Sequence, residues 1–545
     1  MGAPARFLSL SRPPAGLEAR VDPATGLQAA APRPHIATRE SDRSLRTFRG
    51  RVSLSRQRQR QRQRQRQRQR QRQRQRPRPA PSPTGRSGSV GCVVAQVRST
   101  TRRGGRMAID RRMFLLGGAG VLLLAGCSTR PERTLVQDWP TDPPEGAATI
   151  SWWAGQVASK DGGDLRRRLI AEFQKEHPNI RVRIVSAPSD TDTNRTSLTT
   201  QIAAGSSTPD VYLGDVAWPG QFAKNKLATP VNELVGADFF DQFPEGLRQA
   251  ASVDGTYYMF PLYIDESFFL YRKDLLAKHS LQVPGSWEEV RETAAKLVDT
   301  GDVSYGFAFQ GDVYEGLTCN VTEFVADAGG SLLNDDLTKP ETTSSETKRA
   351  FEFMRSLVTS GASPRATLTY QEQDTNDAFS GGRAAFLRNW SYAWGIANGP
   401  DSQVAGKVGL AARPTFDGMD EHHSTIGGWG NYINPHTQQP AAALTFARWM
   451  SSETAQQFLT REGGVLPARS ASLVSEDAKR QERPTYDTAA GITLVPRPTS
   501  TAYYPKVSQG VYQNGNSILG GQTSVDGGTS TMASAIALAL QGEAL

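Results

Sequence analysis

At 545 residues the chain is long for a single domain, which favours two lobes with appendages. Its formal net charge of +9 is unevenly placed: residues 1–127 hold 28 Lys and Arg against 5 Asp and Glu, so the remainder holds 35 basic and 49 acidic residues. An acidic remainder argues against polyanion binding by the folded part, because such binding needs clustered basic side chains.

Residues 1–106 form a leader rich in Arg, Gln, Pro and Ser. Arg and Gln alternate over 56–76 with few apolar residues nearby, so this segment cannot build a core. Three interpretations are open: a nucleic-acid-binding repeat, a disordered extension, or sequence upstream of the true start of translation. The segment that follows favours the last, and we expect neither translation of the leader nor a nucleic-acid partner.

An export signal is predicted at 107–127. Arg111 and Arg112 precede an apolar run over 114–125, which has signal-peptide length and is shorter than the roughly 20 residues of a membrane-spanning helix. The run ends in a Leu-Ala-Gly sequence before Cys127, similar to the bacterial lipobox, whose cysteine takes a diacylglycerol anchor. The alternative for this cysteine is burial in a short core helix. The paired arginines resemble a twin-arginine signal, with ordinary secretion as the other route. We expect an exported protein, lipid-anchored to the outer face of the cell membrane.

The body opens on a strand–helix–strand pattern. Apolar and aromatic residues predict a strand at 149–153, helical spacing predicts a helix over 164–176, and alternation predicts a strand at 180–184. Such a βαβ unit implies parallel strands. The proline-rich stretch 128–147 before it is expected to be an extended tether.

Later segments continue this α/β pattern. Ser286 begins a helix that runs to about 298, with Glu289 completing a capping box. Neither a repeat nor a single linker is visible, as expected if two lobes exchange chain segments more than once. The other predicted elements lie at 196–204, 210–213, 346–359, 384–387, 441–450, 453–460 and 531–540.

Motifs along the whole body resemble the family 1 extracellular solute-binding proteins, the maltose- and trehalose-binding-like receptors of bacterial ABC sugar importers. They occur in family order at 152–153, 208–211, 214–215, 221–223, 255–261, 270–276, 284–289, 378–386, 427–430 and 464–469. The resemblance spans roughly 148–545. It implies a periplasmic-binding-protein-like α/β fold of two α/β lobes with a hinge and a ligand cleft between them. The family's exchange pattern gives lobe one as 148–263 and 407–458, and lobe two as 264–406 and 459–545.

The resemblance also implies a binding function without catalysis or cofactor. A monomeric receptor would capture a carbohydrate, close around it by a hinge motion, and deliver it to ABC permease subunits driven by a cytoplasmic ATPase. Residues 215–218, 389–392 and 427–430 are most similar to receptors for trehalose, maltose and related disaccharides. The expected ligand is therefore a disaccharide or short oligosaccharide.

Carboxylates are the first candidates for the sugar site. Sugars present hydroxyls and flat C–H faces, so their sites combine Asp or Glu, Arg or Asn, and aromatic rings. Asp215 ends a strand and is expected to accept two sugar hydroxyls, the alternative being a helix N-cap. Asp265 lies at the expected crossing to lobe two. Glu266 beside it is either a ligand residue or a brace for the hinge.

Aromatic and basic residues complete the expected site. Trp390, Tyr392 and Trp429 lie on two loops that bind sugar in the family, although core packing is the commoner use of Trp. Gly428 would let the backbone approach the ligand. Arg469 is the expected guanidinium donor from lobe two, the alternative being a surface ion pair. The candidates from a looser alignment are Trp153, Gln156 and Arg195.

A glycoside hydrolase is the competing class of function. It also lines a cleft with carboxylates, and Asp215 with Asp265 are the residues that would form its acid pair. The sequence shows no barrel repeat, and the receptor resemblance covers the whole body, so we expect no enzyme activity.

Metal binding is not predicted. His422 and His423 are adjacent but have no further ligands at metal-binding spacing. The cysteines at 92, 127 and 319 form no CxxC pair and support no disulfide framework. Cys319 is expected to be a buried thiol in a helix.

Overall fold

The computed structural model describes residues 139–157, 159–160, 164–473, 475, 483–489, 491–497, 499 and 501–542. The predicted leader, the export signal and Cys127 lie outside the described residues. Among the helices of the described ranges, none combines the length and the apolar character that a bilayer crossing requires.

Lobe one is built on a six-stranded sheet with the order β13-β6-β12-β3-β1-β2. β1 pairs in parallel with β2 and β3, which confirms the predicted βαβ unit, whereas β12 runs antiparallel to β3 and β6. The strands are β1 (Ala148–Ala154), β2 (Ile180–Ser186), β3 (Val211–Asp215), β6 (Phe260–Asp265), β12 (Gly427–Ile433) and β13 (Leu466–Pro467).

Helices and a short hairpin complete lobe one. They are α2 (Leu165–Glu176), α3 (Thr191–Ala203), α4 (Pro219–Lys224), η1 (Asn232–Leu234), η2 (Phe239–Gln242), α5 (Glu245–Ala251), β4 (Ser252–Val253), β5 (Thr256–Tyr257), α12 (Pro440–Met450), α13 (Glu453–Gly463) and α14 (Ser470–Leu473).

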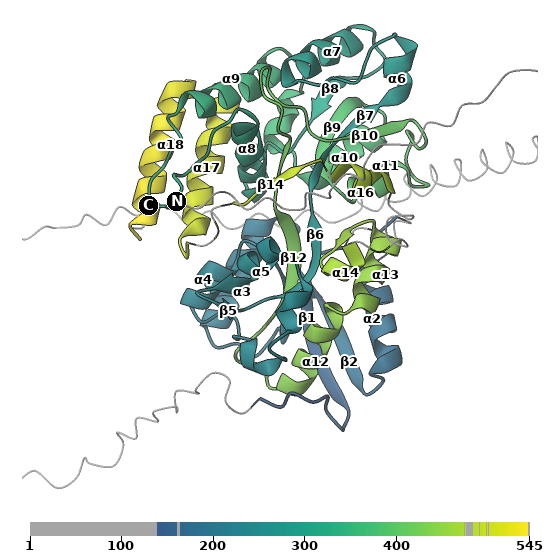
Figure 1. Ribbon diagram of the computed structural model, residues 1–545, viewed down its shortest axis with the longest axis vertical. Coiled ribbons are helices and arrows are strands. Elements are labelled where there is room, and N and C mark those ends of the chain that lie inside the picture. Colours follow the sequence, from purple (N-terminus) through teal and green to yellow (C-terminus); the bar gives the residue numbers. More distant parts are fainter. Residues whose placement is uncertain are drawn as a thin grey trace, which may run out of the picture. The chain divides into compact units, whose positions relative to one another are not determined.

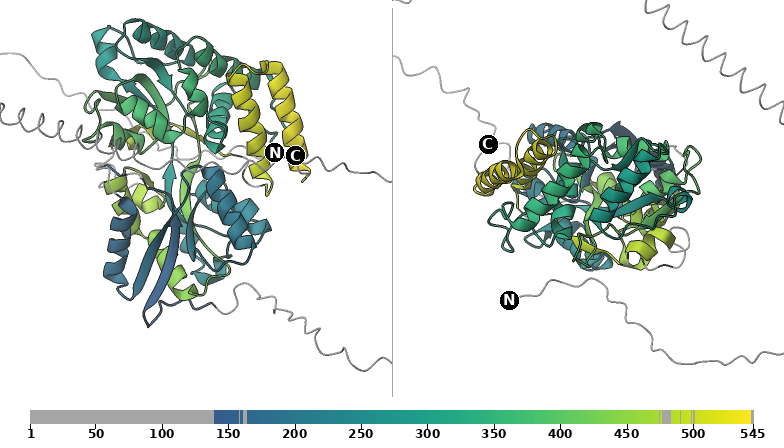
Figure 2. Two further views of the ribbon diagram at one scale, coloured as in Figure 1. Left: turned by 180° about the vertical axis from the view of Figure 1, so that it is seen from behind. Right: turned by 90° about the horizontal axis from the view of Figure 1, so that it is seen from above.

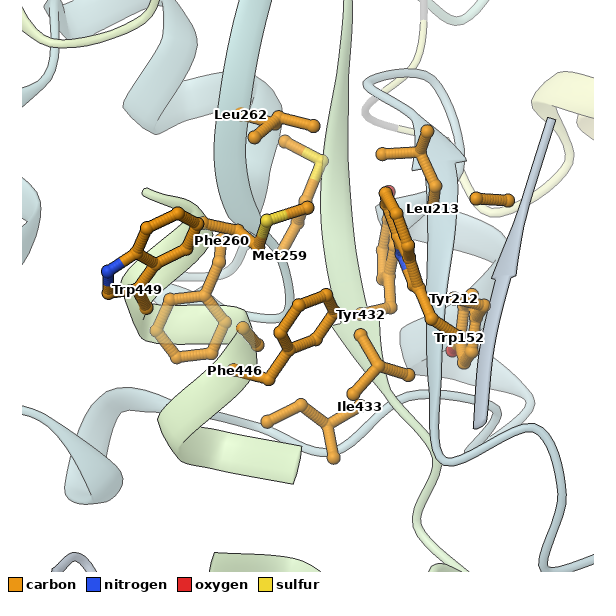
Figure 3. Close-up of a cluster of buried hydrophobic side chains, with 14 of the residues drawn as sticks. Trp152, Tyr212, Leu213, Met259, Phe260, Leu262, Tyr432, Ile433, Phe446 and Trp449 are labelled. Carbon is orange, nitrogen blue, oxygen red and sulfur yellow. The ribbon is translucent and has the colours of Figure 1, made fainter. Parts of the chain in front are cut away.

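Aromatic side chains fill the lobe-one core between the sheet and α12 (Figure 3). Tyr212 on β3 stacks on Tyr432 on β12 with ring centroids 5.3 Å apart. Phe446 on α12 meets Trp152 on β1 edge to face at 5.4 Å. These contacts join strands and helix from distant parts of the sequence, so the sheet edge that carries the candidate site rests on a rigid base.

Lobe two is built on a four-stranded sheet with the order β10-β7-β9-β8. Alternate residues of β7 face opposite layers, with Phe269 in one buried cluster and Phe268 in another. The strands are β7 (Ser267–Arg272), β8 (Tyr305–Ala308), β9 (Ala384–Trp390) and β10 (Val408–Ala411).

Lobe two is mainly helical outside its sheet, and the last two long helices, α17 and α18, lie side by side (Figure 2). The helices are α6 (Lys273–Lys278), α7 (Trp287–Asp299), α8 (Glu315–Asp327), α9 (Ser345–Thr359), η3 (Arg365–Thr369), α10 (Glu372–Ser380), α11 (Ala393–Ala397), α16 (Arg483–Ala489), α17 (Tyr504–Leu519) and α18 (Val525–Leu540).

Three crossing segments join the lobes. β6 leads to β7 through Glu266, and β11 (His423–Thr425) leads to β12 through Ile426. The third crossing lies between α14 of lobe one and α16 of lobe two. The strand that follows, β14 (Thr493–Val495), pairs in parallel with β11 and lies beside β6 and β12 between the lobes (Figure 1).

The sheets place the crossings at other positions than the family pattern did. We expected the chain to return to lobe one at 407, but β10 pairs with β7 in lobe two, so the return comes near 426. We expected it to leave at 458, but β13 pairs with β6 and α13 packs against α2, so lobe one extends to about 473. Strand pairing sets these limits, and a resemblance of motifs does not report pairing.

Local signals at helix ends differ in detail. The Ser286 side chain accepts from Glu289 N at 3.2 Å, as a capping box requires, but the Glu289 carboxylate accepts from Gly285 N at 2.7 Å. α18 begins before the predicted residue 531, because Ser524 caps it. Cys319 is buried in α8, as predicted.

The described part of the predicted tether lies against lobe one. Trp139 packs on the lobe-one core, and Asn179 Nδ2 donates to Pro144 O at 2.6 Å and Gly146 O at 3.1 Å.

Candidate functional site

Residues of several strands meet where the lobe-one sheet reaches the crossings. β3 and β6 end at Asp215 and Asp265, and the antiparallel β12 begins at the same edge. Trp429 therefore pairs with Asp215, and Gly427 pairs with Asp265. The two carboxylates are 8% and 5% exposed. Strand register thus gathers predicted site residues that are far apart in sequence.

The Asp215 carboxylate bonds within its own turn and to a crossing segment. Its Oδ1 accepts from Ala217 N and from Arg497 Nη2, both at 2.7 Å. Trp218 is the N-cap residue of α4, and no side chain in the described ranges caps this helix end. The alternative role of Asp215 as an N-cap is therefore limited to its hydrogen bond with Ala217 N. Arg497 Nη1 donates to Glu315 Oε1 on α8 at 2.7 Å. One buried guanidinium therefore links carboxylates of both lobes.

Asp265 faces lobe two. Ser391 Oγ donates to its Oδ1 at 2.7 Å. Burial raises the pKa of Asp265 to about 7, although the Ser391 hydrogen bond opposes the shift and the Glu372 charge adds to it. Burial therefore destabilises the charged form of this carboxyl. A ligand hydroxyl that donates a hydrogen bond to it would stabilise that form.

Glu266 is buried at the first crossing. Its Oε2 has no hydrogen-bond partner in the described part of the chain. Burial, followed by the Asp265 charge, raises the pKa of Glu266 to about 8. This carboxyl is therefore mainly protonated at neutral pH, and both its candidate roles, ligand residue and hinge brace, stay open.

Two of the predicted aromatic residues come from lobe two. Trp390 ends β9, its Nε1 lies 3.4 Å from Glu372 Oε1, and the Arg388 guanidinium lies 4.2 Å from its ring centroid. Tyr392 is half-buried and packs against the lobe-one core.

Trp429 comes from lobe one and is half-buried. It meets Trp218 edge to face at 6.0 Å. The preceding Gly428 has φ +138°, and a Cβ there would lie 2.6 Å from Tyr263 O. Only glycine fits this position, so close strand contact explains Gly428 without reference to a ligand.

Arg195 on α3, a candidate from the looser alignment, lines an adjoining cavity. Asp192 Oδ2 accepts from the backbone N of Glu315 at 3.0 Å, which joins α3 to lobe two. Arg195 donates to Asp192 at 2.8 Å and to Gln221 at 3.1 Å. A cavity of about 480 Å³ opens here, lined by these residues of lobe one and by Tyr503 and others of lobe two.

The remaining loosely aligned candidates lie on or just after β1. Trp153 Nε1 donates to Asn194 Oδ1 at 2.7 Å and is half-buried. Gln156 is exposed in the loop after β1.

Arg469 does not join this group. Its guanidinium bonds to Ser451 O at 3.2 Å and to Gln242 Oε1, and it lines a different cavity in lobe one. The chain leaves β13 on the lobe-one side, so Arg469 stays with that lobe.

The arginine beside Asp215 is Arg497, which the sequence reasoning did not select. Glu315 and Glu372 were also missed. Arg497 lies in a short segment after a three-residue strand and gives no periodic or motif signal, so its partner Asp215, 282 positions away, is visible only in the fold.

A buried ion network fixes the crossing segments within lobe two. Arg388 Nε donates to Glu323 Oε2 at 2.8 Å, and Arg413 forms an ion pair with Asp327, with Nη2 2.8 Å from Oδ2. Glu323 Oε1 also accepts from Ser267 Oγ at 2.7 Å and from Thr425 Oγ1 at 2.6 Å. Ser267 follows the first crossing and Thr425 precedes the second. One carboxylate therefore holds two crossing segments.

No group of three His, Cys, Asp or Glu side chains suited to a metal ion occurs in the described ranges. Instead, His423 Nδ1 lies 3.3 Å from Asp327 Oδ1. The arrangement at the crossings offers carboxylate acceptors, a guanidinium donor and aromatic faces, a set suited to hydrogen-bonding a polar, hydroxyl-bearing solute.

Comparisons with known proteins identify the family to which the chain is similar. The family model for bacterial extracellular solute-binding proteins matches residues 158–457. A probable ABC transporter-binding protein of Deinococcus radiodurans is 30% identical over 282 residues, covering 51% of this chain and 66% of that protein, just under two thirds. A mannitol-binding protein of Pseudomonas aeruginosa is 27% identical, covering 61% and 76%. The solved structure of maltose-bound T. maritima MalE3 is 29% identical with a TM-score of 0.66, covering 72% and 99%.

Proposed function

Because the chain belongs to the bacterial extracellular solute-binding proteins, we propose that it is the substrate-capturing receptor of an ABC importer for a disaccharide or short oligosaccharide. The observation that carries this proposal is the contact between the lobes at the crossings, where Ser391 of lobe two donates to Asp265 of lobe one. Beside it, Tyr392 packs against the lobe-one core and the Trp390 ring lies next to Gly427. Two hinged halves that each supply polar and aromatic groups suit a receptor that closes on its solute.

Each proposed ligand group has a stated role. Asp215 and Asp265 accept sugar hydroxyls, and Trp390, Tyr392 and Trp429 present ring faces to C–H surfaces. Arg497 replaces Arg469 as the guanidinium donor, because it is the arginine that reaches Asp215. Arg195 serves the adjoining cavity, whose volume of about 480 Å³ lies within the usual range of ligand pockets.

The trehalose or maltose type is the first choice of sugar. The likeness to maltose-bound MalE3 supports it, whereas the likeness to the mannitol-binding protein makes a polyol the alternative. We expect binding at micromolar or tighter dissociation constants, about −8 kcal/mol or better.

Calorimetry against trehalose, maltose, sucrose, cellobiose, xylobiose and mannitol tests this proposal. Heat with a disaccharide and no release of monosaccharide supports a receptor. The absence of binding heat with every sugar of the panel contradicts it. Hydrolysis of a sugar would support the hydrolase alternative instead.

We also propose that the receptor acts as a monomer outside the cell membrane and delivers its ligand to permease subunits coupled to a cytoplasmic ATPase. In addition, we propose that Cys127 carries a lipid anchor. The lipobox-like sequence before Cys127 supports the anchor. Expression with a labelled fatty acid should label the chain and leave the Cys127→Ser variant unlabelled. Equal labelling of both chains would exclude Cys127 as the attachment site.

A further inference from the structure

A second cavity lies in lobe one and is lined by other residues than those of the candidate sugar site. It has a volume of about 280 Å³. Its lining includes Arg448 and Trp449 of α12, Arg469 after β13, His177 after α2, and Phe239 of η2.

The charges in this cavity are one-sided. Two guanidiniums line it, and no Asp or Glu is among its described lining residues. Within the described residues, the Arg469 guanidinium donates to the neutral acceptors Ser451 O and Gln242 Oε1. The Arg448 guanidinium has no hydrogen-bond or ion-pair partner in the part of the chain that the structure describes, and the residue is half-buried. Glu176 lies nearby and accepts from Trp449 Nε1 at 2.9 Å, but it is not part of the lining.

From this arrangement we infer that the lobe-one cavity binds a small oxyanion of the phosphate class. The two guanidiniums that line this cavity present planar N–H donors that match the oxygens of phosphate, and a partly enclosed site strengthens such charge-assisted bonds. His177 also lines the cavity, and its imidazole can supply one more hydrogen-bond donor to the oxyanion. The inference does not depend on the proposed sugar function.

A phosphate group can reach this cavity from two sources. It can be free in solution, or it can belong to an anionic phospholipid. The second source gains support from the chain's path: Asn179, two residues after His177, holds the segment that leads back to Trp139. If Cys127 is lipidated as proposed, residues 128–138 span at most about 40 Å, so this corner of lobe one stays near the membrane.

The test uses the full chain with Cys127→Ser and two further variants. Arg448→Gln removes the guanidinium that has no partner among the described residues. The matched control is Arg181→Gln, which removes a charge from an exposed position on β2 of the same lobe. Calorimetry with sodium phosphate, at an ionic strength matched with sodium chloride, should show saturable binding. Arg448→Gln should weaken that binding by about tenfold or more, and Arg181→Gln should leave it unchanged.

Vesicles of phosphatidylglycerol separate the two sources. Sedimentation that is reduced in Arg448→Gln relative to Arg181→Gln, and competed by free phosphate, assigns the site to a lipid headgroup. Phosphate binding without such a difference on vesicles assigns it to a free oxyanion. No phosphate heat, or equal heat in Arg448→Gln, overturns the inference and leaves Arg448 as a helix-terminal charge. Sugar binding by the same preparation shows that the protein is folded.

Discussion

At the scale of single residues, Asp215 is the proposed ligand group that bonds to Arg497. Replacing it by Asn keeps its volume and the acceptor for Ala217 N but removes the charge that faces Arg497. We expect sugar affinity to fall by about 1–3 kcal/mol, because the sugar hydroxyls then lose a charged acceptor in the site. Calorimetry measures this loss. Asp254→Asn, in the exposed turn between β4 and β5, is the control and should bind as the parent does. Equal affinities would remove Asp215 from the site.

Glu266 leads to a prediction about pH. The pKa of its carboxyl is raised from 4.5 to about 8 in the folded protein, mainly by burial. The folded state therefore holds this proton more tightly than the unfolded state, and its contribution to the free energy of unfolding falls as pH rises from about 4.5 to about 8. Glu266→Gln should gain stability relative to the parent over this window, by about 1–3 kcal/mol at pH 8 and little at pH 4.5.

Urea unfolding of both proteins at the two pH values measures the Glu266 effect. Asp265 is present in both proteins, so the part of its titration that does not depend on Glu266 cancels in the difference. Glu233→Gln, at an exposed position of η1, should show no such pH dependence. A difference that does not change with pH would mean that Glu266 is charged or paired in solution.

At the scale of elements, we expect the ion network of Glu323 to contribute much of the stability of lobe two. Burial alone would raise the pKa of Glu323, but Arg388 and Arg413 lower it to about 2. Glu323→Gln leaves these arginines without their shared carboxylate charge, which should cost about 3–5 kcal/mol of unfolding free energy. Denaturant unfolding measures the cost, with Glu292→Gln on the exposed face of α7 as the control. A loss below about 1 kcal/mol would show that the network is replaceable.

The same scale explains what could be predicted from sequence. The βαβ opening was predictable because apolar spacing at 149–184 is local, and Asp215 and Asp265 were recognisable as strand ends near family motifs. The pairing of β10 with β7 was not, because a four-residue strand carries no signal about its partner. Arg497 was missed and Arg469 selected for a related reason: a motif places a residue along the chain, whereas the crossings decide on which lobe it lies.

At the scale of the whole molecule, the lobes already touch through their own side chains. Asp192 meets Glu315 N, Gln371 Nε2 lies 3.4 Å from Asp190 Oδ2, and Lys224 donates to Tyr503 at 2.5 Å. Such contacts favour a closed arrangement before any solute arrives. Arg497 contributes most, because its buried guanidinium pairs with carboxylates on both sides.

Arg497→Gln should therefore shift the unliganded protein toward a more open arrangement. Spin labels at Arg183→Cys and Glu352→Cys, exposed positions on lobe one and lobe two, report the distance between the lobes once Cys92 and Cys127 are replaced by Ser and Cys319 stays buried. We expect a longer and broader distance distribution for Arg497→Gln than for the parent, and an unchanged one for Lys296→Gln on the surface of α7. Because a ligand shifts a two-state equilibrium only through its different affinity for the two states, a saturating sugar should restore most of the short distance in Arg497→Gln, at a higher concentration than the parent needs. Identical distributions without sugar would mean that Arg497 fixes the local geometry of Asp215 and Glu315 without holding the lobes together.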